Sequence, residues 1–483
     1  MTSPSLVLVL AAGEGTRMRS TTPKVLHEVL GRCMLGHVLH AVEGIDPVAT
    51  CVVTGSGREA VEAWIAASHP HVRCVEQNPR NGTGHAVQIA LSALNNLDLS
   101  NGVVVVSGDT PLLTAATLYR FVEHHRASKA AATILTAELD DATGYGRIVR
   151  DGAGNVIEIV EHRDATDSQR EISEINSGIY VFQAEPLQRA ISQLKSDNAQ
   201  GELYLTDVVK ILHSAGEKIA AFIAADSSEI SGVNDRAQLA EAAAAMRTRI
   251  NHAWMREGVT ILDPATTWIE ADVVIAKDVT IAPSSYLRGR TAVAEGAVIG
   301  PDTTLSNCVV DECAQVIRSH AVDAHIGKGA TVGPFSYLRP GAELHEEAKV
   351  GAYVEIKNSV IGAGSKVPHL SYVGDATIGT NTNIGAATVV VNYDGVQKHH
   401  TVIGDEVRIG SDTMLVAPVT IGDGAYTAAG SVITEDVPPG AMGVGRSRQR
   451  NVLGWVSRRR AGTAADKAAS QALESTPTKT EME

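Results

Sequence analysis

An apolar residue recurs every six positions through the second half of the chain. The longest runs are Ile275, Ile281, Leu287, Val293, Ile299, Leu305, and then Ile326, Val332, Leu338, Leu344, Val350, Ile356. Shorter runs follow: Ile361, Val367, Val373; Ile378, Ile384, Val390; and Ile403, Ile409, Leu415, Ile421. A six-residue apolar repeat is the signature of a parallel β-helix, in which three hexads make one triangular coil. Independent strands of a sandwich would not share this period, so we predict a left-handed parallel β-helix over residues 259–445.

The first part of the chain has a different rhythm. Strand-like stretches at 5–11, 49–55 and 102–107 alternate with amphipathic, helix-like stretches at 35–42, 58–68 and 83–94. This alternation predicts an α/β, Rossmann-like domain over residues 1–235, with a largely parallel sheet covered by helices on both faces. Residues 236–258 have high helix propensity and predict a linker helix.

The remaining segments are less regular. Residues 391–402 interrupt the six-residue repeat, and an insertion between coils must project from the prism. Residues 446–460 are basic, which suits either a solvated tail or attraction to an anionic cofactor with Trp455 as an apolar anchor. The tail after about residue 460 is rich in Ala, Ser, Thr and Glu and predicts disorder within the 446–483 segment.

Composition limits the classes of partner and compartment. The formal net charge of −14 argues against nucleic-acid binding. The 5 cysteines form no Cys-x-x-Cys pair, and their odd number favours reduced thiols. No signal peptide and no apolar run of membrane-spanning length is visible, so we expect a cytoplasmic protein without a membrane partner.

The loop after the first strand, in "LVLVLAAGEGTRMRSTTPKVLHEV", has residues that favour phosphate binding. Gly13 and Gly15 let the backbone approach an anion closely, and Arg17 and Lys24 supply positive charge. The Gly-Lys-Ser/Thr ending of a P-loop is absent. A plain tight turn is the alternative.

Two further residues suggest a magnesium site. Asp109 follows a buried strand in "VVVVSGDTPLL", at the sheet edge where ligands bind, and Asn234 in "ISGVNDRAQL" offers a second oxygen. Asp109 could instead be a helix N-cap or a turn residue, and Asn234 could instead cap the following helix. In the β-helix, "VPHLSYVGD" brings His369 close to Tyr372, and a histidine near neutral pKa suits proton removal from an attacking amine. A lone histidine is, however, more often structural.

Ordered motifs then reveal a resemblance. "LAAGEGTRM", "PKVLHEV", "VEQNPRNGTGHA", "GDTPLL", "GYGRIVR", "IVEHRDA", "EINSGIY" and "GVNDRAQL" resemble the sugar-nucleotide pyrophosphorylases. Joined to a β-helix with "LRPGAEL" and "VPHLSYVGDATIG", the chain resembles the bifunctional bacterial N-acetylglucosamine-1-phosphate uridylyltransferase/glucosamine-1-phosphate N-acetyltransferases over roughly residues 5–456.

The resemblance implies roles in the first domain. UTP would react with N-acetylglucosamine 1-phosphate in the presence of Mg²⁺, releasing pyrophosphate. The implied nucleotide-binding residues are Leu10, Ala11, Ala12, Gly13, Gly15, Arg17, Lys24, Gln77, Gly82 and Thr83. The implied sugar-phosphate residues are Gly146, Glu161, Asn176 and Asn234, with Asp109 and Asn234 holding the metal. Ser107 stands where some relatives have an aromatic residue.

It also implies an acetyl-transfer site in the β-helix, with His369 as the catalytic base for acetylation of glucosamine 1-phosphate by acetyl-CoA. The implied substrate residues are Arg339, Lys357, Tyr372 and Asn383. Asn392 and Tyr393 would bind the sugar phosphate or acetyl-CoA, and the remaining acetyl-CoA residues would be Ala386, Ser411, Ala429 and Arg446. Ala387 stands where many relatives have Gly.

Two other functions fit parts of the pattern. The chain could be a nucleotidyltransferase whose β-helix is structural, or an exchange-factor-like subunit with a degenerate pyrophosphorylase domain. Lys24, Asp109 and Asn234 count against the second. Flat prism faces can pack around a three-fold axis, and the resemblance also implies a homotrimer.

Overall fold

The computed structural model describes residues 3–475. The chain forms two compact units, Met1–Tyr353 and Val354–Glu483, and each is described by itself. No helix among the described residues is long and apolar enough to cross a lipid bilayer. All five cysteines are free thiols, as predicted.

A mixed sheet forms the first part of unit 1. Its main strands run in the order β11 (Ile219–Ile223), β7 (Ala132–Glu138), β10 (Glu174–Phe182), β6 (Val103–Ser107), β1 (Leu6–Leu10), β4 (Thr50–Thr54), β5 (Arg73–Glu76). The hairpin β8 (Arg147–Arg150) and β9 (Val156–Val160) joins through β10. β1, β4, β5 and β6 are parallel, whereas β10 runs antiparallel to both β6 and β7. The sheet is thus less uniformly parallel than predicted.

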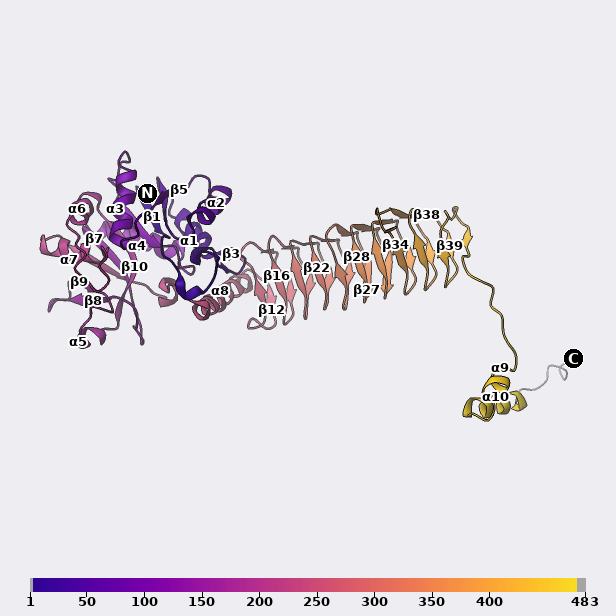
Figure 1. The fold of residues 1–483 in the computed structure, drawn as a ribbon. Helices are drawn as coiled ribbons and strands as arrows, with labels where there is room; N and C mark the ends of the chain where they lie inside the picture. The colour runs from indigo at the N-terminus through magenta and orange to yellow at the C-terminus, as the bar shows by residue number, and fades with distance from the viewer. Residues whose placement is uncertain (1–2, 476–483) are drawn as a thin grey trace. The chain divides into compact units, whose positions relative to one another are not determined.

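Helices cover both faces of this sheet (Figure 1). They are α1 (Met34–Glu43), α2 (Arg58–Ser68), α3 (Thr83–Ala93), α4 (Ala115–Ser128), α6 (Ala184–Ile191) and α7 (Asp207–Ser214), whereas the short α5 (Asp167–Arg170) buries no residue. Alternation along β1 sends Val7 and Val9 into the core with α1 and α4. Leu6 and Leu8 enter the opposite core with α3, α6 and α7. The predicted helices at 35–42, 58–68 and 83–94 are confirmed.

Helix α8 (Arg236–Arg256) confirms the predicted linker helix and lies against both neighbours in unit 1. Ala242 and Met246 join a core cluster with Val29 and Met34 of the sheet domain. At its other end, buried Asn251 donates hydrogen bonds to the carbonyl oxygens of Pro264 (3.0 Å) and Thr267 (2.9 Å).

After α8, unit 1 contains three parallel ladders of short strands (Figure 1). The first comprises β12 (Thr260–Ile261), β15 (Thr280–Ile281), β18 (Val298–Ile299), β21 (Gln315–Val316), β24 (Thr331–Val332) and β27 (Lys349–Ala352). The second comprises β13 (Trp268–Ile269), β16 (Tyr286–Arg288), β19 (Thr304–Ser306), β22 (His320–Val322) and β25 (Tyr337–Leu338). The third comprises β14 (Val274–Ile275), β17 (Ala292–Val293), β20 (Val309–Val310), β23 (His325–Ile326) and β26 (Ala342–Leu344).

Unit 2 has the same three-ladder pattern. One ladder comprises β30 (Lys366–His369), β33 (Asn383–Ile384), β36 (Arg408–Ile409), β39 (Tyr426–Thr427) and β41 (Met442–Gly443). The next comprises β28 (Glu355–Lys357), β31 (Tyr372–Gly374), β34 (Val389–Val391), β37 (Met414–Val416) and β40 (Val432–Ile433). The third comprises β29 (Ser359–Ile361), β32 (Ala376–Ile378), β35 (Thr401–Ile403) and β38 (Val419–Ile421).

The apolar hexad residues point into these coils. Every one of those named in the sequence analysis is at most 5% exposed, which confirms the predicted left-handed β-helix. Small hydroxyl residues fill inward positions beside the turns, and their hydroxyls bond to turn carbonyls. Thr388, for example, donates to the Gly385 oxygen at 2.7 Å. Stacking of equivalent inward positions in successive coils therefore fills the core and gives turn carbonyl oxygens a hydrogen-bond donor.

The predicted disorder of the C-terminal tail is corrected for its first part. Helices α9 (Trp455–Arg459) and α10 (Ala464–Ser475) form there, and neither buries a residue. Alanine has the highest helix propensity of all residues, so this alanine-rich segment forms helix although its composition suggested disorder. The rest of the predicted disordered tail, residues 476–483, lies outside the described residues.

Replacing Asn251 with Ala tests the anchorage of α8 to the first coil. The substitution leaves two buried carbonyl groups without their donor, so we expect the free energy of unfolding to fall by about 1–3 kcal/mol. Thermal unfolding of the full chain measures the effect. Thr248→Ala is the matched control, because the exposed Thr248 hydroxyl bonds only to Ala244 of its own helix. Equal stability of the two variants would contradict the anchoring role.

Candidate functional site

A cavity of about 620 Å³ opens in unit 1 at the carboxyl ends of β1 and β6. Nine of the residues predicted from the sequence line it: Leu10, Ala11, Ala12, Gly13, Lys24, Gln77, Gly82, Thr83 and Asp109. Ser107 also lines it. Gly15 and Arg17 lie outside the lining, at the short helix η1 (Thr16–Met18). The structure thus gathers residues from several loops at the sheet edge where α/β proteins bind ligands.

Two glycines of this loop system are required by geometry. Gly15 has φ +63°, and a Cβ there would lie 2.5 Å from the Lys24 Cβ. Gly82 has φ +94°, and a Cβ there would lie 2.6 Å from the Leu203 carbonyl oxygen. The Gln77 Nε2 donates to the Gly82 oxygen at 2.8 Å, which fixes this turn against the cavity wall. Only glycine allows these close approaches.

Lys24, Asp109 and Asn234 meet at the cavity. The Lys24 ammonium, in η2 (Lys24–Leu26), donates hydrogen bonds to the Asp109 carboxylate and, at 2.7 Å, to the Asn234 Oδ1. Neither Asp109 nor Asn234 caps a helix. Thr114 caps α4 and Asp235 caps α8, so helix capping is excluded for both residues, whereas Asp109 does lie in the turn that follows β6.

The oxygens of Asp109 and Asn234 fit the ligand preference of Mg²⁺. They are hard donors, and the Lys24 ammonium that touches both shows that a cation is stabilised at this point. Among residues 3–475, no group of three or more His, Cys, Asp or Glu side chains could hold a metal.

Three of the residues predicted to bind the sugar phosphate, Gly146, Glu161 and Asn176, also lie close together. A Cβ on Gly146 would lie 3.6 Å from both the Asn176 Cβ and the Glu161 Oε2. The backbone N–H of Asn176 donates to the backbone oxygen of Gly146 at 2.9 Å. Burial raises the pKa of Glu161, whose carboxylate accepts a hydrogen bond from Thr206 (3.3 Å). A methyl group at Gly146 would make ordinary contacts with these two residues and a tight one, 3.2 Å, with the Ile159 Cγ2.

Sequence reasoning missed several residues at this site. Thr206 precedes α7 and reads as an ordinary helix start, so its contact with Glu161 had no local signal. Glu14 and Arg80 both line the cavity and form an ion pair of 2.6 Å across it. Their separation of 66 residues hides this pairing from any local pattern.

In unit 2, predicted acetyl-CoA residues stack at one corner of successive coils. The Ala387 amide donates to the His369 oxygen (3.2 Å), and the Asp412 amide donates to the Ala386 oxygen (2.7 Å). The next step is the same, because the Gly430 amide donates to the Ser411 oxygen (2.8 Å). We call this series of turns the first corner; the His369 side chain is exposed there.

The first corner continues to the last coils. Ala429 precedes Gly430, and a Cβ on Gly430 would lie 3.7 Å from the Arg446 Cδ. Ala387, the departure from the relatives' glycine, has φ +59°, a backbone conformation that favours glycine. The added methyl group thus occupies a strained turn beside His369.

The other predicted residues of unit 2 lie at a second corner. Tyr372 on β31 has its hydroxyl 3.4 Å from the Asn392 Nδ2, and Lys357 ends β28 beside β31 in the same ladder. Asn383 is the exception, because it pairs with Lys366 in the first ladder of unit 2. Tyr393 is 56% exposed on the insertion.

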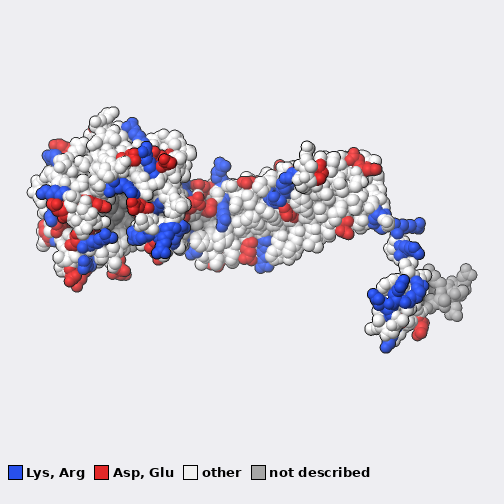
Figure 2. All heavy atoms as spheres, in the orientation of Figure 1, with Lys and Arg blue, Asp and Glu red and all other residues white. Residues whose placement is uncertain are grey.

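Arg339 belongs to unit 1, where it lies between β25 and β26. The basic segment 446–460 carries several arginines, visible as a blue cluster near the C-terminus (Figure 2). Trp455 in this segment is 47% exposed, and the Arg460 guanidinium stacks over its ring at 5.6 Å. Within the described chain, Trp455 therefore does not act as a buried anchor.

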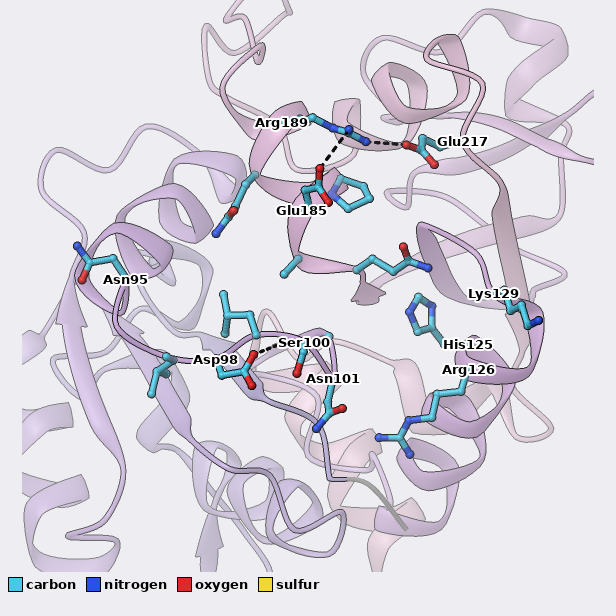
Figure 3. Close-up of a pocket in the computed structure, with 17 residues that line it drawn as sticks. Asn95, Asp98, Ser100, Asn101, His125, Arg126, Lys129, Glu185, Arg189 and Glu217 are labelled. Atoms are coloured by element: carbon cyan, nitrogen blue, oxygen red, sulfur yellow. Dashed lines mark hydrogen bonds and ion pairs between the residues drawn. The ribbon is translucent and has the colours of Figure 1, made fainter.

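A second cavity, of about 890 Å³, lies at the opposite edge of the sheet domain and is lined by residues such as Gly102, just before β6 (Figure 3). It contains none of the predicted site residues. Arg189, which projects over it, is ion-paired with Glu217 (2.7 Å) and Glu185 (3.5 Å). Two of the carboxylates that line this cavity are thus paired with Arg189.

Known proteins match both parts of the chain. The nucleotidyl transferase family model matches residues 6–258, and the GMPPB C-terminal domain model matches residues 321–422. The bifunctional protein GlmU of Corynebacterium efficiens is 54% identical, covering 98% of each chain. GlmU of Streptomyces coelicolor is 55% identical, covering 96% of this chain and 97% of its own. The chain belongs to the nucleotidyl transferases and, within them, to the bifunctional GlmU proteins.

Proposed function

We propose that this chain makes UDP-N-acetylglucosamine in two steps, with UTP and acetyl-CoA as co-substrates. Glucosamine 1-phosphate is first acetylated in the β-helix, and the product is then uridylylated in the sheet domain. The observation that carries the proposal is the meeting of Lys24, Asp109 and Asn234 beside the 620 Å³ cavity. Relatives that match nearly the whole chain, both regions included, favour two activities over a nucleotidyltransferase with a structural β-helix.

In uridylyl transfer, a phosphate oxygen of N-acetylglucosamine 1-phosphate attacks the α-phosphorus of UTP. The bond to the bridging oxygen breaks, and pyrophosphate leaves with the electron pair. The reaction needs no protein nucleophile, so the chain contributes positioning and charge. Lys24 and Arg17 bind phosphate oxygens, Gln77 reads the uracil edge, and Glu161 with Asn176 orients the sugar.

We assign Asp109 and Asn234 as the residues that hold Mg²⁺. When bound, the ion neutralises charge on the phosphates. A divalent ion and the Lys24 ammonium compete for the same two oxygens. Asp109 and Asn234 would hold the ion, and the neighbouring Lys24 ammonium would add positive charge for the phosphates.

In acetyl transfer, the amine of glucosamine 1-phosphate attacks the thioester carbon of acetyl-CoA. His369 accepts the amine proton, and the coenzyme A thiolate leaves. The exposed His369 at the first corner is accessible to both substrates. Ala386, Ser411, Ala429 and Arg446 follow it along that corner and would contact the long coenzyme.

We further propose domain boundaries of 1–235, 236–258, 259–445 and 446–483, a cytoplasmic location and a homotrimer. Five free cysteines suit a reducing compartment. The projecting insertion after Val391 can reach the groove of a neighbouring prism, so acetyl transfer would use groups from more than one chain.

Asp109→Ala should abolish uridylyl transfer and leave acetyl transfer largely intact, because Asp109 belongs to the site in unit 1. Separate assays of pyrophosphate and thiol release measure the two activities. Glu59→Ala, at an exposed position of α2, is the control. Comparable loss of both activities in a folded Asp109→Ala chain would refute the assignment.

His369→Ala should slow acetyl transfer by about 10²–10⁴-fold if the imidazole is the general base. Uridylyl transfer to added N-acetylglucosamine 1-phosphate should persist. Near-normal acetylation across pH would remove His369 from the mechanism.

Mixing His369→Ala chains with Asn392→Ala chains tests the shared site. Each variant alone should be inactive in acetyl transfer. If the two residues serve one site from different chains, some mixed trimers should regain activity. Absence of recovery, with subunit exchange verified by mass, would place both residues on one chain.

A further inference from the structure

A buried carboxylate, Asp375, lies at the second corner and has no assigned role. It occupies the turn between β31 and β32 and is 8% exposed. Its Oδ1 accepts hydrogen bonds from Asn358 Nδ2 (2.7 Å) and Lys357 Nζ (3.2 Å). Its Oδ2 accepts from Lys357 Nζ (3.1 Å) and from Asn392 Nδ2 (2.6 Å).

Asp375 also fastens both ends of the projecting insertion. The Asn392 side chain binds its carboxylate at the start, and the Thr401 amide donates to the Asp375 backbone oxygen (3.1 Å) at the end. The Asp375 amide in turn donates to the Lys357 oxygen (3.0 Å). One residue therefore connects Lys357 with both roots of residues 392–400.

The electrostatics keep this carboxylate ionised. Burial by itself raises the pKa of Asp375, but donors from Asn358, Lys357 and Asn392 outweigh it, so the pKa is lowered. Removing the carboxylate would leave the largely buried Lys357 ammonium without its counter-charge, and the Asn392 amide, which is 7% exposed, with only its longer contact to the Tyr372 hydroxyl, 3.4 Å. Such unmatched groups move toward water, taking the loop root with them.

We propose that Asp375 is a positioning residue of the acetyl-transfer site, holding Lys357 and the roots of the 392–400 insertion in one arrangement. The inference rests on the proposed function for what the site binds. An ammonium has three N–H donors, so Lys357 keeps donor capacity for the phosphate of glucosamine 1-phosphate while Asp375 sets its direction. Asp375 itself touches no reacting atom.

The test is Asp375→Asn in the full chain. The isosteric amide removes the charge and one acceptor, so the KM for glucosamine 1-phosphate should rise about 10- to 100-fold. The kcat of uridylyl transfer should not change and serves as the measure of folding. Asp394→Asn is the matched control, because Asp394 bonds only within the insertion, to Val396, Gln397 and His399.

Hydrogen exchange gives the readout that does not depend on activity. Amides of residues 392–401 should exchange faster in Asp375→Asn than in the wild type. The double variant Asp375→Asn, Asn392→Asp restores an amide–carboxylate pair and should recover protection. If Asp375→Asn fails to fold, Asn358→Ala replaces it, because loss of the Asn358 donor frees the Asp375 carboxylate to move and should loosen its hold on Lys357 and Asn392.

Unchanged KM together with unchanged exchange would overturn the proposal. A loss of uridylyl transfer equal to the loss of acetyl transfer would also overturn it, since a general folding role would then explain the effect. A wild-type chain without acetyl transfer would refute the proposed function instead. The exchange measurement would still decide whether Asp375 holds the insertion.

Discussion

One ammonium group holds the carboxyl edge of the sheet domain together. Lys24 reaches Asp109, 85 residues later, and Asn234, 210 residues later, and hydrogen-bonds to both. Lys24 follows the glycine loop, Asp109 follows β6, and Asn234 lies in the segment before α8. Because Asp235 caps α8 directly after Asn234, the same contact fixes the start of the linker helix relative to the nucleotide loop. The geometry of the candidate metal site and the position of α8 are therefore not independent.

The β-helix is held together by the stacking of equivalent residues in successive coils. Each inward apolar residue packs on its equivalent one coil away, and each turn stacks on the turn before it. A residue beside a turn therefore lies next to the residue one coil later. Asp375 and Asn392, which are 17 positions apart, are neighbours for this reason. The two corners of unit 2 arise in this way, and they separate His369 from the Lys357–Asp375–Asn392 cluster by ladder position. Regular stacking thus brings residues from distant parts of the sequence together along one corner.

Local patterns predicted the elements well and their pairings poorly. The six-residue period defined the β-helix because it follows directly from coil geometry. The antiparallel direction of β10 left no local trace, since alternation of apolar residues is the same in either direction. Helix α10 was missed because composition suggested disorder, while helix propensity acts without any buried face. Asp375 and Thr206 were missed because each looks like an ordinary turn or cap residue until distant segments surround it.

The most direct test of the account is anomalous diffraction from full-length crystals containing Mn²⁺ and UDP-N-acetylglucosamine. We expect an anomalous peak bound by the oxygens of Asp109 and Asn234, with the Lys24 ammonium moved onto a phosphate oxygen. A divalent ion and the ammonium cannot occupy one point between the same oxygens, so the two changes should occur together. A bound Mn²⁺ held only by phosphates, with Lys24 still on Asp109 and Asn234, would contradict the account.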